Sequence, residues 1–361
     1  MEPVDILYMC GPIGYEKSVS GNYYIYKILC DYLKKYNIKC ISIWDYPHHS
    51  YCNPSHFIKY FPWNELKSLS NEKLVELLPK HKILFLCGDD FTEDQLIFIK
   101  EHYKSKIFIL AMTSWVFGNG RESYPEIEGS LISEVAKERA IKYKKADIDI
   151  INASTYSSHV QTHSFFCNLN NHVIPLITIE NVEKYNVKKN TNLDFKTILW
   201  GTTQPNCFRK GKHKLETILE ILYNKYKKTN IKINNVGPNT YIKSPYEVIS
   251  CGILDKKEMA NIYHQSDVFA LTTLADSGPM MATECIYNET PLVSYNTNIA
   301  YDITDNGING YTVDTDEEFA DKLYEILFEE KYKMSIEHLF KFLSTEKILE
   351  KYKSIFDKYI Q

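Results

Sequence analysis

The sequence lacks long hydrophobic runs, paired-cysteine motifs and a strong excess of either charge. No apolar stretch approaches the roughly 20 residues of a membrane-spanning helix, and the N-terminal MEPVDILYMCGP lacks a signal-peptide pattern. The formal net charge is -4, so nothing favours nucleic acid as the main partner, and any phosphate must bind at a local site. We therefore expect a cytoplasmic protein that touches a membrane, if at all, peripherally at its inner face.

Cysteine and histidine spacings exclude two further classes of protein. The nine cysteines include no C-x-x-C pair and are scattered through apolar segments, which favours buried, reduced thiols over a disulfide framework. The eleven histidines show no H-E-x-x-H or similar spacing, so we expect no metal site. Two Asp-x-Asp sequences, at 147–149 and 314–316, follow no predicted strand end, and we interpret both as surface carboxylates.

Short apolar runs alternate with amphipathic segments in the first half of the chain. The runs at 5–10, 39–44, 82–87, 106–111 and 148–152 are predicted strands, and helices are predicted at 22–35, 92–103 and 132–143. Strands that are apolar throughout and separated by helices are typical of a parallel sheet covered on both faces.

After a polar connection at 183–196 the same pattern restarts. Strands are predicted at 197–200, 232–236, 267–271 and 291–294, and helices at 211–228, 255–264, 280–288 and 317–328. The sequence thus predicts two doubly wound α/β domains, 1–185 and 186–340. A C-terminal helix within 341–361 carries an apolar stripe and is expected to pack back toward the N-terminal domain; its mixed charge disfavours the alternative, a membrane-surface helix.

The most informative segment, 266–312, runs from a predicted strand through a loop into a helix. Asp276 and Glu284 stand there with seven residues between them. The N–H groups of Met280 and Met281 would point out of the helix N-terminus, an environment that suits a phosphate. Glu284, about one turn further on, could bind a ribose diol with both carboxylate oxygens, and Asp276 could reach a sugar attached to that phosphate.

This segment resembles the retaining glycosyltransferases of family 4, which have the GT-B fold. Their signature is a glutamate, seven residues and a second glutamate, then a Gly-Thr-Pro-Val-Val run and a later Asn-Gly. Here Asp276, Glu284, the run Thr290-Pro291-Leu292-Val293 and the pair Asn309-Gly310 follow in that order, with Asp replacing the first Glu. The spelling at 275–281 is similar to a subgroup associated with capsule and lipopolysaccharide assembly. The resemblance implies two Rossmann-like domains facing each other across a cleft.

The resemblance also implies which residues bind the donor. Arg209 and Lys210 match a basic step that brings cations onto the donor pyrophosphate, although a solvated basic helix start is the alternative. Arg supplies a bidentate fork and Lys a compact charge. Thr202 stands where the family usually has Arg.

The other substrate-binding residues implied by the resemblance lie in loops. They are Gly201, Thr202 and Thr203 after a strand; Ser277, Gly278, Pro279, Met280 and Met281 at the step from a loop into a helix; Gly252, Ile253 and Leu254 against the nucleobase; and Gly14 and Gly21 in the N-terminal domain. Plain turns are the alternative for Gly14 and Gly21, and simple packing for Ile253 and Leu254.

The resemblance therefore implies a glycosyltransferase of class EC 2.4 that passes a sugar from a nucleotide-diphosphate-sugar to an acceptor hydroxyl with retention. Asp276, Arg209 and Lys210 are its expected catalytic residues, and no metal or cofactor is expected besides the nucleotide-sugar. The expected acceptor is a glycan or glycolipid, in the synthesis of a polysaccharide, lipopolysaccharide or glycolipid. Two alternatives are a nucleotide-sugar epimerase of the same fold and a non-catalytic nucleotide-sugar-binding subunit.

Overall fold

The computed structural model describes residues 1–10, 14–15, 18–19, 21–42, 53–60, 63–88, 91–111, 129–182, 194–276, 278–297 and 299–360. They form two compact units. Unit 1 comprises the described residues of Met1–Asn119, Gly129–Thr178 and Thr345–Gln361, and unit 2 those of Ile179–Ser344. The sequence places the boundary at 185/186, a few residues further along the chain.

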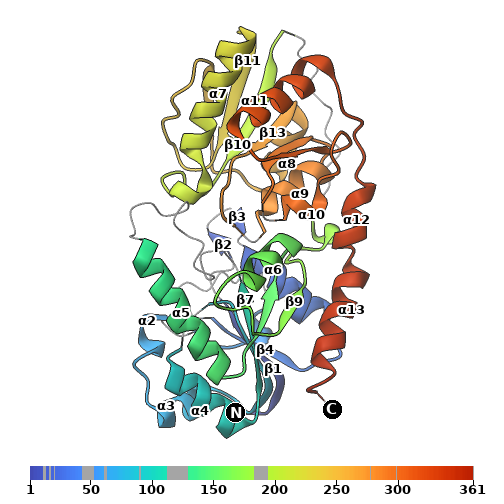
Figure 1. Ribbon diagram of the computed structural model, residues 1–361. Helices are drawn as coiled ribbons and strands as arrows, with labels where there is room; N and C mark the ends of the chain where they lie inside the picture. The colour runs from blue at the N-terminus through green and yellow to red at the C-terminus, as the bar shows by residue number, and fades with distance from the viewer. Residues whose placement is uncertain are drawn as a thin grey trace. The chain divides into compact units, whose positions relative to one another are not determined.

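Unit 1 is built on a parallel sheet (Figure 1). Its seven strands follow the order β5-β4-β1-β6-β7-β8-β9. Its strands are β1 (Val4–Cys10), β4 (Ile38–Ser42), β5 (Phe57–Tyr60), β6 (His81–Leu86), β7 (Lys106–Ala111), β8 (Asp149–Asn152) and β9 (Asn171–Val173). The five central strands coincide with the five predicted apolar runs, whereas the short edge strands β5 and β9 were not predicted. Leu7 and Tyr8, which point to opposite faces, are both fully buried, so both faces are covered.

Helices cover the two faces of this sheet. On one face α3 (Asn71–Leu77), α4 (Glu93–Tyr103) and α5 (Gly129–Lys145) share a core with the strands. Near the other face lie α1 (Gly21–Tyr26) and η1 (Lys27–Tyr32), where the predicted helix continues as a π-helix. The remaining elements are β2 (Gly14–Tyr15), β3 (Ser18–Val19), η3 (Pro54–His56), α2 (Trp63–Leu66) and α6 (Thr155–Thr162).

The C-terminal helix α13 (Thr345–Phe356) belongs to unit 1. Phe356 is fully buried, and its ring lies 6.3 Å from Phe85 and 5.9 Å from Phe108 of the sheet. Lys35 and Tyr36 both donate hydrogen bonds to Asp357. The stretch 341–361 is thus not one helix, because Ser344 ends α12 (Glu337–Leu343), which belongs to unit 2.

Unit 2 contains a six-stranded parallel sheet in the order β12-β11-β10-β13-β14-β15. Its strands are β10 (Lys196–Gly201), β11 (Ile231–Val236), β12 (Glu247–Gly252), β13 (Val268–Leu271), β14 (Leu292–Tyr295) and β15 (Gly310–Val313). Its helices are η5 (Ile179–Asn181), η6 (Phe208–Lys210), α7 (Lys212–Tyr226), α8 (Lys256–Gln265), α9 (Met280–Tyr287), α10 (Ala300–Ile303), α11 (Asp316–Tyr324), η7 (Glu325–Glu329) and α12. Trp200 of β10 is buried in one core with side chains of α7 and α11.

Two expectations about surface chemistry were wrong. Asp149 is not a surface carboxylate: it is 2% exposed, and it pairs with Lys106 at 2.8 Å and with His172 at 2.9 Å. The thiols are free in the described residues, but they are not all buried, since Cys167 is exposed. None of the described helices combines the length and apolar character needed to cross a membrane.

Candidate functional site

The site lies where the strand order of unit 2 reverses. From β10 the chain builds the sheet outward through β11 and β12, and it then returns to the other side of β10 with β13. Because β10 and β13 are parallel neighbours, the loops that follow them leave the same edge of the sheet side by side. In open α/β sheets, ligands bind outside the carboxyl ends of strands at such a switch point.

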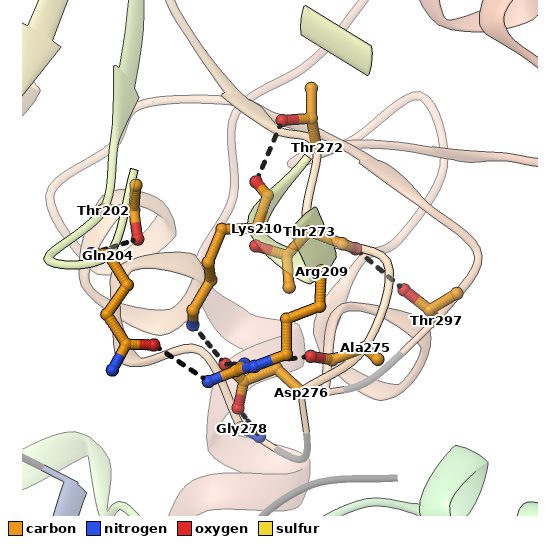
Figure 2. A network of polar contacts seen from close by, with 10 residues as sticks. All are labelled: Thr202, Gln204, Arg209, Lys210, Thr272, Thr273, Ala275, Asp276, Gly278 and Thr297. Atoms are coloured by element: carbon orange, nitrogen blue, oxygen red, sulfur yellow. Dashed lines mark hydrogen bonds and ion pairs between the residues drawn. The ribbon is translucent and has the colours of Figure 1, made fainter. Parts of the chain in front are cut away.

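Asp276, in the loop after β13, contacts both basic residues of the loop after β10 (Figure 2). Its Oδ2 lies 2.5 Å from Lys210 Nζ and 3.1 Å from Arg209 Nη1. The guanidinium of Arg209 also donates to Ala275 O at 3.0 Å and to Gln204 Oε1 at 3.2 Å. The structure therefore brings the three expected catalytic residues together.

The ion pairs keep Asp276 charged. Burial acts to raise the pKa of this carboxyl, but the charges of Lys210 and Arg209 outweigh burial and hold the pKa below its ordinary value. The three side chains are only 12% to 16% exposed, so solvent screens these pairs less than it screens surface pairs. Two cations share one carboxylate here, which leaves the trio with one positive charge in excess.

Gly211 fixes the backbone that carries the two cations. It follows η6 at a φ of 72°, and a Cβ there would lie 1.9 Å from Thr272 O. Thr272 is held in turn by Trp200, whose Nε1 donates to its hydroxyl at 2.9 Å. The N–H of Leu274 donates to Arg209 O at 2.8 Å, which joins the two loops through their backbones as well.

The N-terminus of α9 lies beside these loops. The helix begins at Met280, and Pro279 stands at the N-cap position. Pro279 makes no side-chain hydrogen bond that caps the helix, and Ala282 N donates to Pro279 O at 3.0 Å, so the N–H groups of Met280 and Met281 are the first ones without an acceptor within the helix. A Cβ on Gly201 would lie 3.0 Å from both Met281 Cε and Val236 O, so the end of β10 lies close to α9 and an added carbon there would be tight.

Glu284 lies one turn inside α9, and Tyr263 of α8 donates a hydrogen bond to its Oε2 at 2.9 Å. Sequence reasoning missed both Tyr263 and Gln204. Gln204 shares the basic loop with Arg209 and Lys210, and this could have suggested it. Tyr263 gave no such signal, because one more aromatic residue on the apolar side of a helix predicts only packing.

The residues expected at the nucleobase lie at the end of β12. Gly252 closes this edge strand at a φ of 71°, and its carbonyl accepts from Gly237 N at 2.9 Å. Ile253 is 51% exposed, so it is not a simple packing residue. The N–H of Thr202 donates to Val236 O at 3.0 Å, which places the β10 loop next to the end of β11.

The remaining expected site residues either lie away from this cluster of side chains or fall outside the residues that the structure describes. Thr203 is exposed and Leu254 is half-buried. Gly14 and Gly21 belong to unit 1, where Gly14 lies in β2 and Gly21 begins helix α1 instead of lying in a loop. Ser277 lies outside the described residues. In the described part of the chain, no group of three or more His, Cys, Asp or Glu residues could hold a metal ion.

Comparison with known proteins identifies the fold. Residues 246–338, which include Asp276 and Glu284, match the family described as glycosyl transferases group 1. A sucrose-phosphate synthase from Thermosynechococcus elongatus is 13% identical, with a TM-score of 0.70 and coverage of 99% of each chain. HepE from Anabaena, in complex with UDP, is 14% identical, with a TM-score of 0.67 and coverage of 98% of this chain and 100% of that one. The chain has the GT-B fold of glycosyltransferases.

A third match is to a longer protein of the same fold. TarM from S. aureus, a point mutant in complex with Fondaparinux, alpha-GlcNAc-glycerol and UDP, is 15% identical, with a TM-score of 0.59. The match covers 80% of this chain but 58% of TarM, so this chain spans little more than half of that protein's length. No curated protein sequence matches this chain. The expected α/β fold class, with two Rossmann-like units, is confirmed, and the assignment to family 4 stays a prediction.

Proposed function

We propose that the protein is a glycosyltransferase that passes a sugar from a nucleotide-diphosphate-sugar to an acceptor hydroxyl. One observation carries the proposal: Arg209, Lys210 and Asp276 converge beside the uncapped start of α9, at the switch point of the sheet in unit 2. The match to glycosyl transferases group 1 supports it, as does the fold shared with HepE, which was solved in complexes with UDP and with UDP-glucose.

The donor's diphosphate would lie against the two cations and the helix N-terminus. Arg209 and Lys210 supply positive charge, and the N–H groups of Met280 and Met281 supply donors at the positive end of the helix dipole. Glu284 would bind the ribose diol further along α9. The nucleobase would lie near Gly252, at the edge of the sheet.

The same groups would assist the departure of the leaving group. Negative charge develops on the diphosphate as its bond to the sugar breaks, and charges already in place stabilise such a transition state without reorganisation. In this proposal Arg209 and Lys210 act without a metal ion, Asp276 contacts the sugar hydroxyls, and the anomeric configuration is retained.

The proposed acceptor is a glycan or glycolipid, and the proposed setting is the synthesis of a polysaccharide, lipopolysaccharide or glycolipid in the cytoplasm or at the inner face of a membrane. The subgroup resemblance at 275–281 supports this choice. So does the fold shared with TarM, whose complex contains a glycosylated glycerol.

Calorimetric titration with UDP and with GDP tests the donor site. Wild type should bind at least one of them, and Glu284→Ala and Lys210→Ala should each weaken binding at least tenfold. Lys225→Ala is the matched control, because Lys225 pairs with Asp321 near the other end of α7 and should leave binding unchanged. Failure of wild type to bind either nucleotide would refute the proposal.

Turnover of the donor distinguishes the transferase from its two rivals. An epimerase would convert the sugar when the donor is incubated alone. A binding subunit would bind the donor but neither transfer nor hydrolyse the sugar with any acceptor tried. The transferase should release the diphosphate much faster once a suitable acceptor is added, and Lys210→Ala should lower that rate about 100-fold.

A further inference from the structure

A buried tyrosine from a neighbouring helix contacts the carboxylate expected to bind ribose. Tyr263 Oη donates to Glu284 Oε2 at 2.9 Å, and Tyr263 is 1% exposed. We propose that Tyr263 is a positioning residue that orients Glu284 toward the ribose diol and so sets the preference of the site for ribose over 2′-deoxyribose. The inference rests on the proposed function, because it takes the ribose as the ligand of Glu284.

Tyr263 is itself held firmly. Its carbonyl accepts hydrogen bonds from Thr290 Oγ1 at 2.7 Å and from Ser266 N at 3.0 Å. Its ring meets Phe269 of β13 edge-on, with the centroids 6.4 Å apart. Because the ring is held in this way, its hydroxyl has a fixed position. The hydrogen bond therefore forms only when the carboxylate of Glu284 adopts the matching position.

The backbone of Glu284 is held from the same region. Asn288 Nδ2 donates to Glu284 O at 2.8 Å, and Thr290, two residues later, is the residue that binds the carbonyl of Tyr263. The end of α9 is therefore tied to α8 through both side chain and backbone. The contact from Asn288 holds the backbone of Glu284, and the hydrogen bond from Tyr263 holds its carboxylate.

A carboxylate has about four lone-pair sites, and the hydrogen bond from Tyr263 takes up one of them. Without the phenol, the flexible glutamate side chain samples several rotamers, and ordering them on binding costs entropy. Loss of this orientation should weaken a ligand more, the more ribose hydroxyls it offers to Glu284. A ligand that lacks the 2′-hydroxyl gains less from the oriented carboxylate and loses less when the orientation is lost.

The test compares UDP or GDP, whichever wild type binds more tightly, with its 2′-deoxy form. Wild type should prefer the ribonucleotide about tenfold, since a hydrogen bond to a charged group is involved. Tyr263→Phe should remove most of this preference by weakening the ribonucleotide more than the 2′-deoxy form, and it should raise KM for the donor while leaving kcat nearly unchanged. A merely structural role would lower kcat and weaken both nucleotides equally.

Tyr246→Phe is the matched control. Tyr246 is also buried in unit 2, but its hydroxyl has no hydrogen-bond partner among the described residues, so this variant should keep the wild-type preference. Tyr263→Phe with wild-type melting behaviour and an unchanged preference would overturn the inference alone. A wild type without preference, together with unchanged binding by Glu284→Ala, would overturn the ribose role of Glu284 and the inference with it.

Discussion

Asp276 Oδ2 and Lys210 Nζ lie 2.5 Å apart although 66 positions separate the two residues in the sequence. The carboxylate of Asp276 is therefore bound to Lys210, one of the two cations that we propose for the donor's diphosphate. Arg209 Nη1, from the other cation, contacts the same carboxylate oxygen. A bound diphosphate must compete with this internal anion. Once displaced from the cations, Asp276 would be available to the sugar.

Removing the charge of this carboxylate should separate binding from transfer. We expect Asp276→Asn to bind a nucleoside diphosphate about three- to tenfold more tightly, because both cations then face the ligand without a competing charge. Transfer should fall about 100-fold, because the sugar loses its carboxylate. Calorimetry at two salt concentrations measures the first effect and a donor assay the second. Asp321→Asn, which removes the partner of Lys225, should change neither; weaker binding by Asp276→Asn would contradict the argument.

The glycine after the two cations should tolerate no side chain. Gly211→Ala would place Cβ 1.9 Å from Thr272 O, so the backbone beneath Arg209 and Lys210 must shift, and nucleotide binding should fall at least tenfold. Gly307→Ala is the control, because Gly307 also has a positive φ, of 80°, but nothing closer than 3.9 Å to the added carbon. Gly307→Ala should cost only the conformational strain, about 1–2 kcal/mol, and keep binding intact. Equal nucleotide affinity in the two variants would contradict the steric reason.

The C-terminal helix should stabilise the unit that contains the N-terminus. Phe356→Ala removes a fully buried ring between Phe85 and Phe108, and it should lower the free energy of unfolding of unit 1 by about 3–5 kcal/mol. Phe340→Ala in α12, where the ring is 41% exposed, should cost far less. Urea unfolding followed by far-UV circular dichroism measures both, and similar losses would show that the contacts of Phe356 contribute little.

A buried histidine should make unit 1 sensitive to acid. Burial lowers the pKa of His81 to about 4, while an unfolded chain has about 6.5. Its Nδ1 lies 2.7 Å from Pro79 O, and its Nε2 has no partner among the described residues. Because the unfolded state binds the proton first, the stabilisation is complete above about pH 6.5 and is lost as the pH falls toward 4, by about 1.4 kcal/mol per pH unit. The difference in unfolding free energy between wild type and His81→Phe should show this slope; a flat difference would contradict it.

The core of the fold was predictable from the sequence because its strands are buried on both faces. In the predicted run 106–111 every residue after Lys106 is apolar, and β7 has those bounds. The edge strands escaped prediction for the opposite reason. Every residue of β12 is exposed or half-buried, so burial gives the strand no hydrophobic pattern, and its strand geometry comes from hydrogen bonds with β11.

The candidate site was predictable as a set of residues but not as an arrangement. The spacing of Asp276 and Glu284 and the basic pair at 209–210 each suggested a ligand separately. The contact of Asp276 with Arg209 and Lys210 depends on β10 and β13 being neighbours in the sheet, and no local sequence pattern reveals this. The hydrogen bond from Tyr263 to Glu284 likewise depends on how α8 and α9 pack.

The place of α13 has a consequence for the order in which the chain can fold during synthesis. Among the described residues, unit 2 occupies the span between Thr178 and Thr345, whereas unit 1 has segments on both sides of that span. Every residue of unit 2 is translated before the first residue of α13. The part of unit 1 that precedes α13 therefore lacks the contacts of Phe356 with Phe85 and Phe108 until α13 has been translated, by which point every described residue of unit 2 has already been synthesised.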